Sequence, residues 1–172
     1  MSSRYGPPQR LAEHHILERF RCGSSAQTEW LRHFARQSAS TGTTKVFVVT
    51  EHEHDEVIAY YAWCMAQVYA SDAPQRLRRG GGRYPRPVAL LARLGVHVDH
   101  EGRGIGAGLL QDVFVRLSRL SEDIGCRGLV VHAESARARA FYQHLVPEFE
   151  ASPTDDLHLV LLTKDIRRAL GS

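Results

Sequence analysis

The stretch from Val88 to Ile124 limits the possible folds more than any other part of the sequence. It opens with a strongly apolar run from Val88 to Val98, interrupted by Arg93 and Gly95, which predicts a buried strand. A turn with alternating glycines follows, and after it the apolar residues keep a helical period for about five turns. We therefore expect a buried strand, a glycine turn and a long amphipathic helix, an order typical of α/β proteins.

Shorter elements are predicted on both sides of this unit. The patterns of apolar, branched and aromatic residues predict four strands, over 46–49, 57–69, 129–131 and 157–162. Helical spacing predicts helices around 30–35 and 138–145, and a first strand or extended segment is expected at 11–20. Loops are expected at 38–44, 51–56 and 71–86. Together these elements predict a mixed α/β sheet with helices on its faces.

Length and composition narrow the class of protein. A chain of 172 residues is expected to form a single domain over residues 1–172. It has no apolar run of about 18 residues, so no membrane span is expected, and its polar first ten residues lack the apolar core of a signal peptide. Its three cysteines are widely spaced, which predicts reduced thiols and no zinc site. We expect a cytoplasmic protein without a metal.

The glycine turn has a specific chemical capacity. Glycines allow a tight turn and a close approach to a ligand, and the first amides of a helix have no partner within it. With the helix dipole, they form an anion site suited to a pyrophosphate, and Arg103 adds a positive side chain. A glycine-rich turn without a ligand is the alternative. A Walker loop is excluded because Gly-Lys-Ser/Thr is absent, and the alternating glycines do not match a dinucleotide fingerprint.

Two motifs resemble those of the GNAT superfamily of N-acetyltransferases. The family's pyrophosphate loop, Gln/Arg-x-x-Gly-x-Gly/Ala, stands here as Glu101 to Gly106, with Glu101 in place of Gln or Arg. Its second signature, Asn-x-x-Ala-x-x-Phe-Tyr, stands here as Ser135 to Tyr142, and the segment from Leu145 to Phe149 replaces the usual Gly-Phe pair. The resemblance implies the GNAT fold: a mixed, mostly antiparallel sheet, splayed at its centre, with helices on both faces.

The resemblance also implies acetyl-CoA as co-substrate and a set of residues that bind it. The pantetheine would bind backbone groups of Leu94, Gly95 and Val96. The pyrophosphate would bind Gly102, Arg103, Gly104, Ile105 and Gly106. Further contacts with CoA are expected from Ser135, Arg139 and Phe141. Tyr142 is the expected general acid, because a phenol with a pKa of about 10 carries a proton at neutral pH.

Within the superfamily the chain is similar to the acetyltransferase toxins of type II toxin–antitoxin modules, the TacT and AtaT type. The matching features lie between Phe20 and Leu162 and include the Tyr60-Tyr61 pair. This resemblance implies acetylation of the α-amine of an aminoacyl-tRNA, inhibition of translation, a ribbon-helix-helix antitoxin and a homodimer. The alternatives are a GNAT enzyme that acts on a small amine or a protein N-terminus, and a non-catalytic CoA-binding module.

Clustered arginines are the predicted contacts for tRNA phosphates. The formal net charge is only +3, so their distribution matters more than the sum. The predicted contacts are Arg76, Arg78, Arg79, Arg83 and Arg86, which flank three glycines, together with Arg32 and Arg36. A solvated basic loop remains the alternative, and an acidic antitoxin segment could cover the same arginines without excluding tRNA binding. Arg93, inside an apolar strand, is expected to pair with a carboxylate or to reach a cleft.

Overall fold

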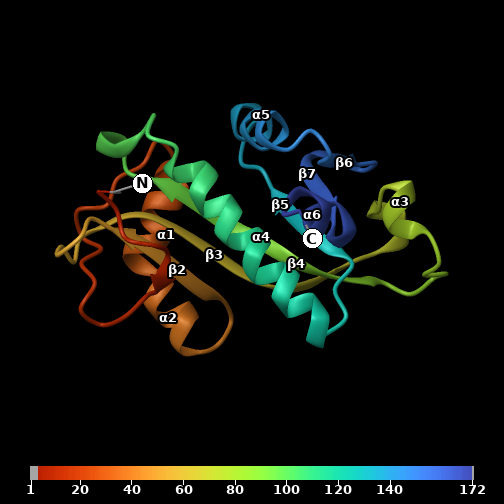
Figure 1. The fold of residues 1–172 in the computed structure, drawn as a ribbon, viewed down its shortest axis with the longest axis horizontal. Helices are drawn as coiled ribbons and strands as arrows, with labels where there is room; N and C mark the ends of the chain where they lie inside the picture. The colour runs from red at the N-terminus through yellow and green to blue at the C-terminus, as the bar shows by residue number, and fades with distance from the viewer. Residues whose placement is uncertain (1–3, 172) are drawn as a thin grey trace. The chain divides into compact units, whose positions relative to one another are not determined.

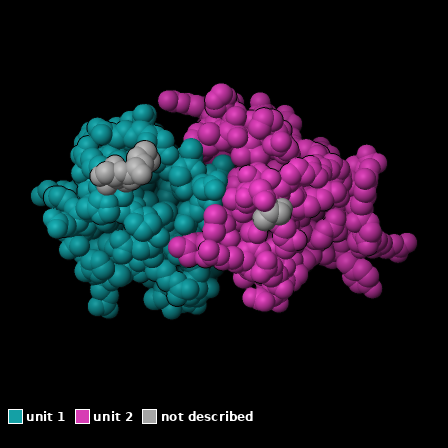
Figure 2. All heavy atoms as spheres, in the orientation of Figure 1, with its two compact units in different colours: residues 1–64, 92–112 teal, residues 65–91, 113–172 magenta. Residues whose placement is uncertain are grey.

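The computed structural model describes residues 4–171. Contacts between residues divide it into two compact units, which interleave along the chain and are coloured separately in Figure 2. Unit 1 contains residues 1–64 and 92–112, and unit 2 contains residues 65–91 and 113–172. Residues 1–3 and 172, the ends of the predicted single domain, lie outside the described residues. None of the helices within 4–171 is long and apolar enough to cross a membrane.

The elements follow the order labelled in Figure 1. The strands are β1 (Gln9–Arg10), β2 (Lys45–Thr50), β3 (Val57–Val68), β4 (Arg86–Val96), β5 (Gly128–His132), β6 (Glu150–Ser152) and β7 (Asp155–Leu162). The α-helices are α1 (Ser25–His33), α2 (Ala35–Ser40), α3 (Gln75–Arg78), α4 (Ile105–Asp123), α5 (Ala136–Leu145) and α6 (Thr163–Ala169). Two short 3-10 helices are η1 (Ala70–Asp72) and η2 (Val98–His100). The strand order β1-β2-β3-β4-β5-β7-β6 makes a mixed sheet, and the predicted α/β class is confirmed.

In unit 1, β3 carries helices on both of its faces because neighbouring side chains of a strand point in opposite directions. Tyr60 stacks on Trp30 of α1, with ring centroids 6.0 Å apart, and its hydroxyl donates to the carbonyl of Gln27. Tyr61 points to the other face, where its hydroxyl donates to Asp112 of α4 at 2.7 Å. Both tyrosines are fully buried, so the Tyr60-Tyr61 pair anchors one helix on each side of the strand.

In unit 2, the pairings of β5 and β7 form the centre of the sheet. β5 runs parallel to β4 over Ala89–Leu91 and antiparallel to β7 over its whole length. One face carries a cluster in which Leu77 of α3 packs with Val130 and Val160. α6 packs against β5 and β7, and α5 packs against β7.

Several segments differ from the sequence-based expectation. The segment 11–20 is not a strand: only Gln9–Arg10 pair with β2, and tight turns at His15 and Phe20 insert Leu17 and Phe20 into the core. The predicted loop 71–86 contains α3, because the fully buried Leu77 ties it to the sheet. β6 and α6 were not predicted, and α6 is held by the buried Ile166.

The close pairing of β5 and β7 leaves no room for a side chain at Gly128. A Cβ there would lie 2.6 Å from the backbone oxygen of Leu161. We expect Gly128→Ala to lower the free energy of unfolding by about 1–3 kcal/mol, since the strands must separate to admit the methyl group. Urea denaturation checks this. Gly125→Ala, where a Cβ meets nothing within 4 Å, is the control and should be neutral or stabilising by up to about 1 kcal/mol. Equal effects of the two changes would contradict this explanation.

Candidate active site

The glycine turn of unit 1 joins β4 to α4 through a backbone that only glycine adopts easily. Gly102 and Gly104 have φ angles of +75° and +78°, in the left-handed region. A Cβ at either position would meet no atom within 4 Å, so backbone conformation and not lack of space requires glycine. The two left-handed residues turn the chain sharply enough for α4 to begin at Ile105.

The start of α4 presents donors to solvent. The first helical hydrogen bond runs from the Gly108 amide to the Gly104 carbonyl, so the amides of Ile105, Gly106 and Ala107 lie in the turn whose donors have no partner within the helix. Residues 101–104 are exposed, and Arg103 lies among them. Amides and helix dipole together favour an anion here, as the spacing of the glycines predicts.

Glu101 is the residue of this turn that departs from the family's pattern. Its Oε1 atom lies 3.8 Å from the position that a Cβ on Gly23 would occupy. The carboxylate therefore points toward the loop before α1. Ile105, Gly106 and Ala107, which carry the amide donors of α4, are half-buried beside it.

The end of β4 supplies the segment expected to bind pantetheine. Gly95 is buried so tightly that a Cβ would lie 3.3 Å from both Cys22 Sγ and Tyr60 Cε1. Leu94 and Val96 are half-buried, and the next residue, His97, donates its amide to Ile58 of β3 at 2.8 Å. Packing at Gly95 thus holds this part of β4 close to β3. The pantetheine contacts themselves stay a prediction.

Helix α5 of unit 2 carries the second motif. Ser135 is its N-cap, and its hydroxyl accepts a hydrogen bond from the Ala138 amide at 3.1 Å. The residue predicted to contact CoA therefore also stabilises the start of the helix. Arg139 and Phe141 are half-buried. The helix packs on β7 and places Tyr142 on its buried side.

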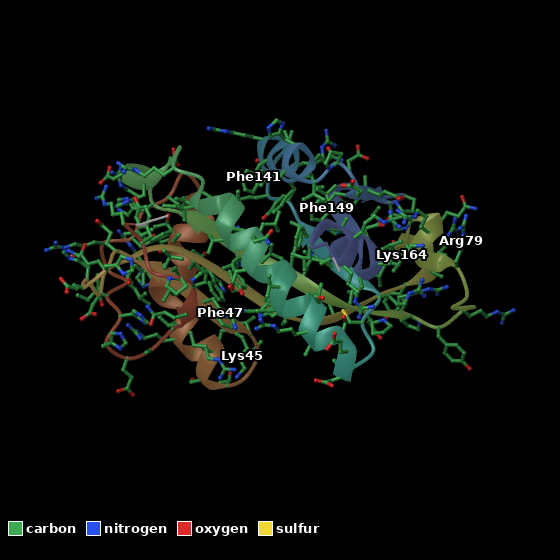
Figure 3. All side chains as sticks on the ribbon, viewed as in Figure 1. Lys45, Phe47, Arg79, Phe141, Phe149 and Lys164 are labelled. Atoms are coloured by element: carbon green, nitrogen blue, oxygen red, sulfur yellow. The ribbon has the colours of Figure 1, made fainter. Side chains whose placement is uncertain are left out.

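Tyr142 lies in an aromatic cluster that the sequence did not reveal completely. Its ring makes edge contacts with Phe141, centroids 5.1 Å apart, and with Phe149, centroids 5.9 Å apart; both phenylalanines are labelled in Figure 3. Only 6% of Tyr142 is exposed, and this burial raises the pKa of the phenol well above its ordinary value. The phenol therefore keeps its proton at neutral pH. Phe149 occupies the segment that replaces the family's Gly-Phe pair.

The thiols lack the environment of a nucleophile. Burial raises the pKa of both Cys64 and Cys126, which keeps them protonated. Cys22 is buried in the core of unit 1. All three are free thiols, as expected. Among residues 4–171, no group of three or more His, Cys, Asp or Glu side chains is arranged to hold a metal ion.

The predicted RNA-contacting arginines fall into two groups. Arg78, Arg79 and Arg83 are exposed. Arg86, by contrast, is only 2% exposed, and its guanidinium donates to three backbone carbonyls, those of Leu77, Arg78 and Tyr84. It therefore braces the chain between α3 and β4 and is not available to RNA.

The remaining arginines of the predicted set are also engaged. Arg76 forms two hydrogen bonds with Asp165, at 2.9 and 3.1 Å. In unit 1, Arg32 donates to the Phe20 carbonyl, and Arg36 donates to the carbonyls of Ala12 and His15. These side chains hold the N-terminal segment against α1 and α2.

Arg93 reaches a groove and does not pair with a carboxylate among the described residues. Its guanidinium carbon lies 5.5 Å from the Trp30 ring centroid, and it donates to Gln27 at 3.4 Å. The groove has a volume of about 510 Å³ and also includes the exposed Phe34. The expectation that Arg93 reaches a cleft is confirmed, whereas its contact with Trp30 could not be predicted from the sequence.

Comparisons with known proteins agree with this geometry. Residues 43–145 match the family described as an acetyltransferase (GNAT) domain. The chain is 38% identical to the tRNA-acetylating toxin of Mycobacterium tuberculosis (strain ATCC 25618 / H37Rv), over 98% of this chain and 99% of the relative.

Two solved structures have the same fold. A structure of AtaT complexed with acetyl-methionyl-tRNAfMet has a TM-score of 0.86 at 22% identity, covering 96% of this chain and 99% of AtaT. A second structure is that of a mutant AtaT toxin bound to the C-terminus of the antitoxin AtaR and acetyl-CoA. It has a TM-score of 0.83 at 21% identity, covering 99% of this chain and 100% of AtaT. The match over residues 43–145 and the full-length relative place this chain in the GNAT family of acetyltransferases.

Proposed function

We propose that this enzyme transfers the acetyl group of acetyl-CoA to the α-amine of an aminoacyl-tRNA and so blocks translation. The supporting observation is the 38% identity to a tRNA-acetylating toxin over nearly the whole of both chains. The AtaT structure with acetyl-methionyl-tRNAfMet adds support at the level of the fold. Such a substrate implies action in the cytoplasm.

In this proposal, the turn before α4 binds the diphosphate of acetyl-CoA. The amides of Ile105 and Gly106 donate to its oxygens, and the exposed Arg103 adds a positive charge. Backbone groups of Leu94, Gly95 and Val96 bind the pantetheine as an added strand would. The amide of Val96 polarises the thioester carbonyl, where negative charge develops as the amine attacks.

Tyr142 acts as the general acid. The amine nitrogen attacks the carbonyl carbon, a C–N bond forms, and the C–S bond then breaks. The sulfur leaves with the electron pair of that bond and takes a proton from the phenol, while the nitrogen releases one proton to solvent, from which the phenol is reprotonated. The raised pKa of the buried phenol means that Tyr142 carries this proton throughout the physiological pH range.

The acceptor amine needs little help to become a nucleophile. A free α-amino group has a pKa of about 7.7, and an ester on the neighbouring carboxyl lowers it further. A large fraction is therefore neutral at physiological pH, so the reaction does not require a strong base.

The exposed arginines Arg78, Arg79 and Arg83 are the proposed contacts for tRNA phosphates. The guanidinium groups of Arg32, Arg36 and Arg86 donate to backbone carbonyls, so these three arginines are not among the proposed tRNA contacts. We further propose a homodimer and a ribbon-helix-helix antitoxin as partner. The AtaT structure with the C-terminus of its antitoxin supports an antitoxin as partner.

Changing the left-handed turn should weaken the binding of acetyl-CoA. Gly104→Ala places a Cβ on a residue with a φ of +78°, so the turn must either strain or open, at about 1–2 kcal/mol. We expect the Kd for acetyl-CoA, measured by calorimetry, to rise by about tenfold. Gly42→Ala imposes the same strain at a φ of +78° in the loop before β2 and should leave this Kd unchanged. An unaltered Kd for Gly104→Ala would remove the turn from the site.

Removing the phenol oxygen should separate chemistry from binding. Tyr142→Phe is expected to lower kcat by about 100-fold or more, because general acids typically contribute that much, while the Kd for acetyl-CoA stays within about twofold. Because burial raises its pKa, Tyr142 should cause no loss of kcat as pH rises from 7 to about 10. Tyr84→Phe, at a side chain that is 81% exposed, is the control. Normal turnover by Tyr142→Phe would exclude it as the acid.

The acceptor and its contacts can be tested together. Labelled acetyl-CoA should acetylate charged tRNA in preference to free amino acids and polyamines. Arg78→Gln with Arg83→Gln should weaken tRNA binding and reduce the slope of log K against log salt by about 2, since each lost phosphate contact removes about 0.9. The matched control is Arg10→Gln with Arg119→Gln, which removes the same amount of positive charge outside this loop. Label on small amines alone would support the alternative acceptor, and equal slopes would indicate a merely solvated loop.

A further inference from the structure

A basic cavity in unit 2 shares only Arg79 with the proposed tRNA contacts and has no part in the chemical step. It has a volume of about 270 Å³ and lies among α3, the segment between α4 and β5, and α6. Five cationic side chains line it, namely Arg76, Arg79, Arg127, Lys164 and Arg167. Within residues 4–171, no carboxylate lines the cavity, and the side chain of Ser121 also faces it. Arg127, Lys164 and Arg167 were not singled out by the sequence, because more than thirty residues separate Arg127 from the others.

Backbone hydrogen bonds hold the walls of this basic cavity in place. The Thr163 amide donates to the Arg127 carbonyl at 3.0 Å, and its hydroxyl donates to the Cys126 carbonyl at 2.9 Å. The Arg127 amide donates to the carbonyl of Pro87, in β4, at 2.8 Å. These bonds fix the segment before β5 to both α6 and β4. The cavity is therefore formed in advance, and does not require a mobile loop to close.

The charges around the cavity are only partly neutralised. Arg76 is paired with Asp165, whose side chain is 3% exposed, and a second contact reaches Glu150. Among residues 4–171, Arg79, Arg127 and Lys164 have no carboxylate within 4 Å; Arg127 donates instead to the Arg79 carbonyl at 3.3 Å. Arg79 and Lys164, both exposed, are labelled in Figure 3.

This excess of positive charge favours an anionic ligand. Like charges facing one cavity repel each other, and the repulsion is relieved when a multiply charged anion binds between them. Arginine presents planar, paired donors that match phosphate oxygens, and lysine adds a compact charge. The volume is below the range of about 300–1,000 Å³ of most small-molecule pockets, which indicates a compact ligand.

We infer that the basic cavity of unit 2 binds phosphate groups through Arg127, Lys164 and Arg167, with Arg79 at its rim. Arg76, already paired with Asp165, holds the wall. The Ser121 hydroxyl, which accepts from Arg167 at 2.7 Å, orients that guanidinium toward the ligand. The site uses side chains of unit 2, whereas the diphosphate of acetyl-CoA is assigned to backbone amides of unit 1. It goes beyond the proposed acetyl transfer and does not depend on it.

Inorganic pyrophosphate is the probe for this site. Calorimetry at low salt, with saturating CoA so that the turn before α4 is occupied, should detect binding to the whole protein. Arg127→Gln with Lys164→Gln should raise the Kd for pyrophosphate by at least about tenfold, since each lost charged hydrogen bond costs about a factor of ten. Arg79→Gln with Lys164→Gln, at two exposed side chains, tests the same site if the first variant does not fold.

Two matched variants control for charge and for shape. Lys45→Gln with Arg119→Gln removes two positive charges outside the cavity and should leave the Kd within about twofold. Arg127→Lys with Lys164→Arg keeps both charges and should retain most of the binding. No pyrophosphate binding by the unaltered protein, or equal affinity in all variants, would overturn the inference.

The source of the phosphate is decided by a second arm with uncharged tRNA. If tRNA affinity falls in Arg127→Gln with Lys164→Gln, and pyrophosphate competes with tRNA, then the ligand is a phosphate of the RNA backbone. If only pyrophosphate binding is lost, then the ligand is a free phosphorylated molecule. Acetylation of charged tRNA, measured separately, keeps a failure of this inference distinct from a failure of the proposed function.

Discussion

The left-handed backbone at Gly102 and Gly104 is the constraint on which the rest of unit 1 depends. It allows β4 to end and α4 to begin within a few residues, so the first amides of a long helix emerge beside a strand that is packed tightly through Gly95. Tyr61 then ties α4 to β3 through Asp112. An anion site and a rigid support for it therefore come from the same short segment, without any charged side chain being buried.

The arginines show how a protein divides one residue type between structure and function. A guanidinium that leaves water needs partners for its donors, and Arg86 finds them in three carbonyls while Arg76 finds them in a buried carboxylate. These two hold α3 against the sheet and α6. Arg32 and Arg36 are likewise bound to backbone carbonyls. Arg78 and Arg83 remain in solvent, and Arg79 and Arg127 line the basic cavity, where excess positive charge favours a polyanion. Similar sequence neighbourhoods therefore lead to opposite roles.

Much of the fold could be predicted, because it depends on local patterns. The strand–turn–helix unit and Tyr142 on its helix were located from apolar periodicity and motif spacing, and α4 ends at Asp123, close to the expected 124. The segment 11–20 was mistaken for a strand, since apolar residues that anchor turns in a core look like those of a strand. α3 was not predicted because only one apolar residue of the helix, Leu77, is buried.

The sequence by itself determined the elements, the glycine turn and the chemistry of the phenol, since glycine content, hydrophobic period and side-chain type are properties of neighbouring residues. Only the tertiary structure decided the burial that raises the pKa of Tyr142, the contact of Arg93 with Trp30, and the grouping of Arg127 with Lys164. Burial and charge depend on residues far apart in the chain, which come together only when the strands pair and the helices pack on them.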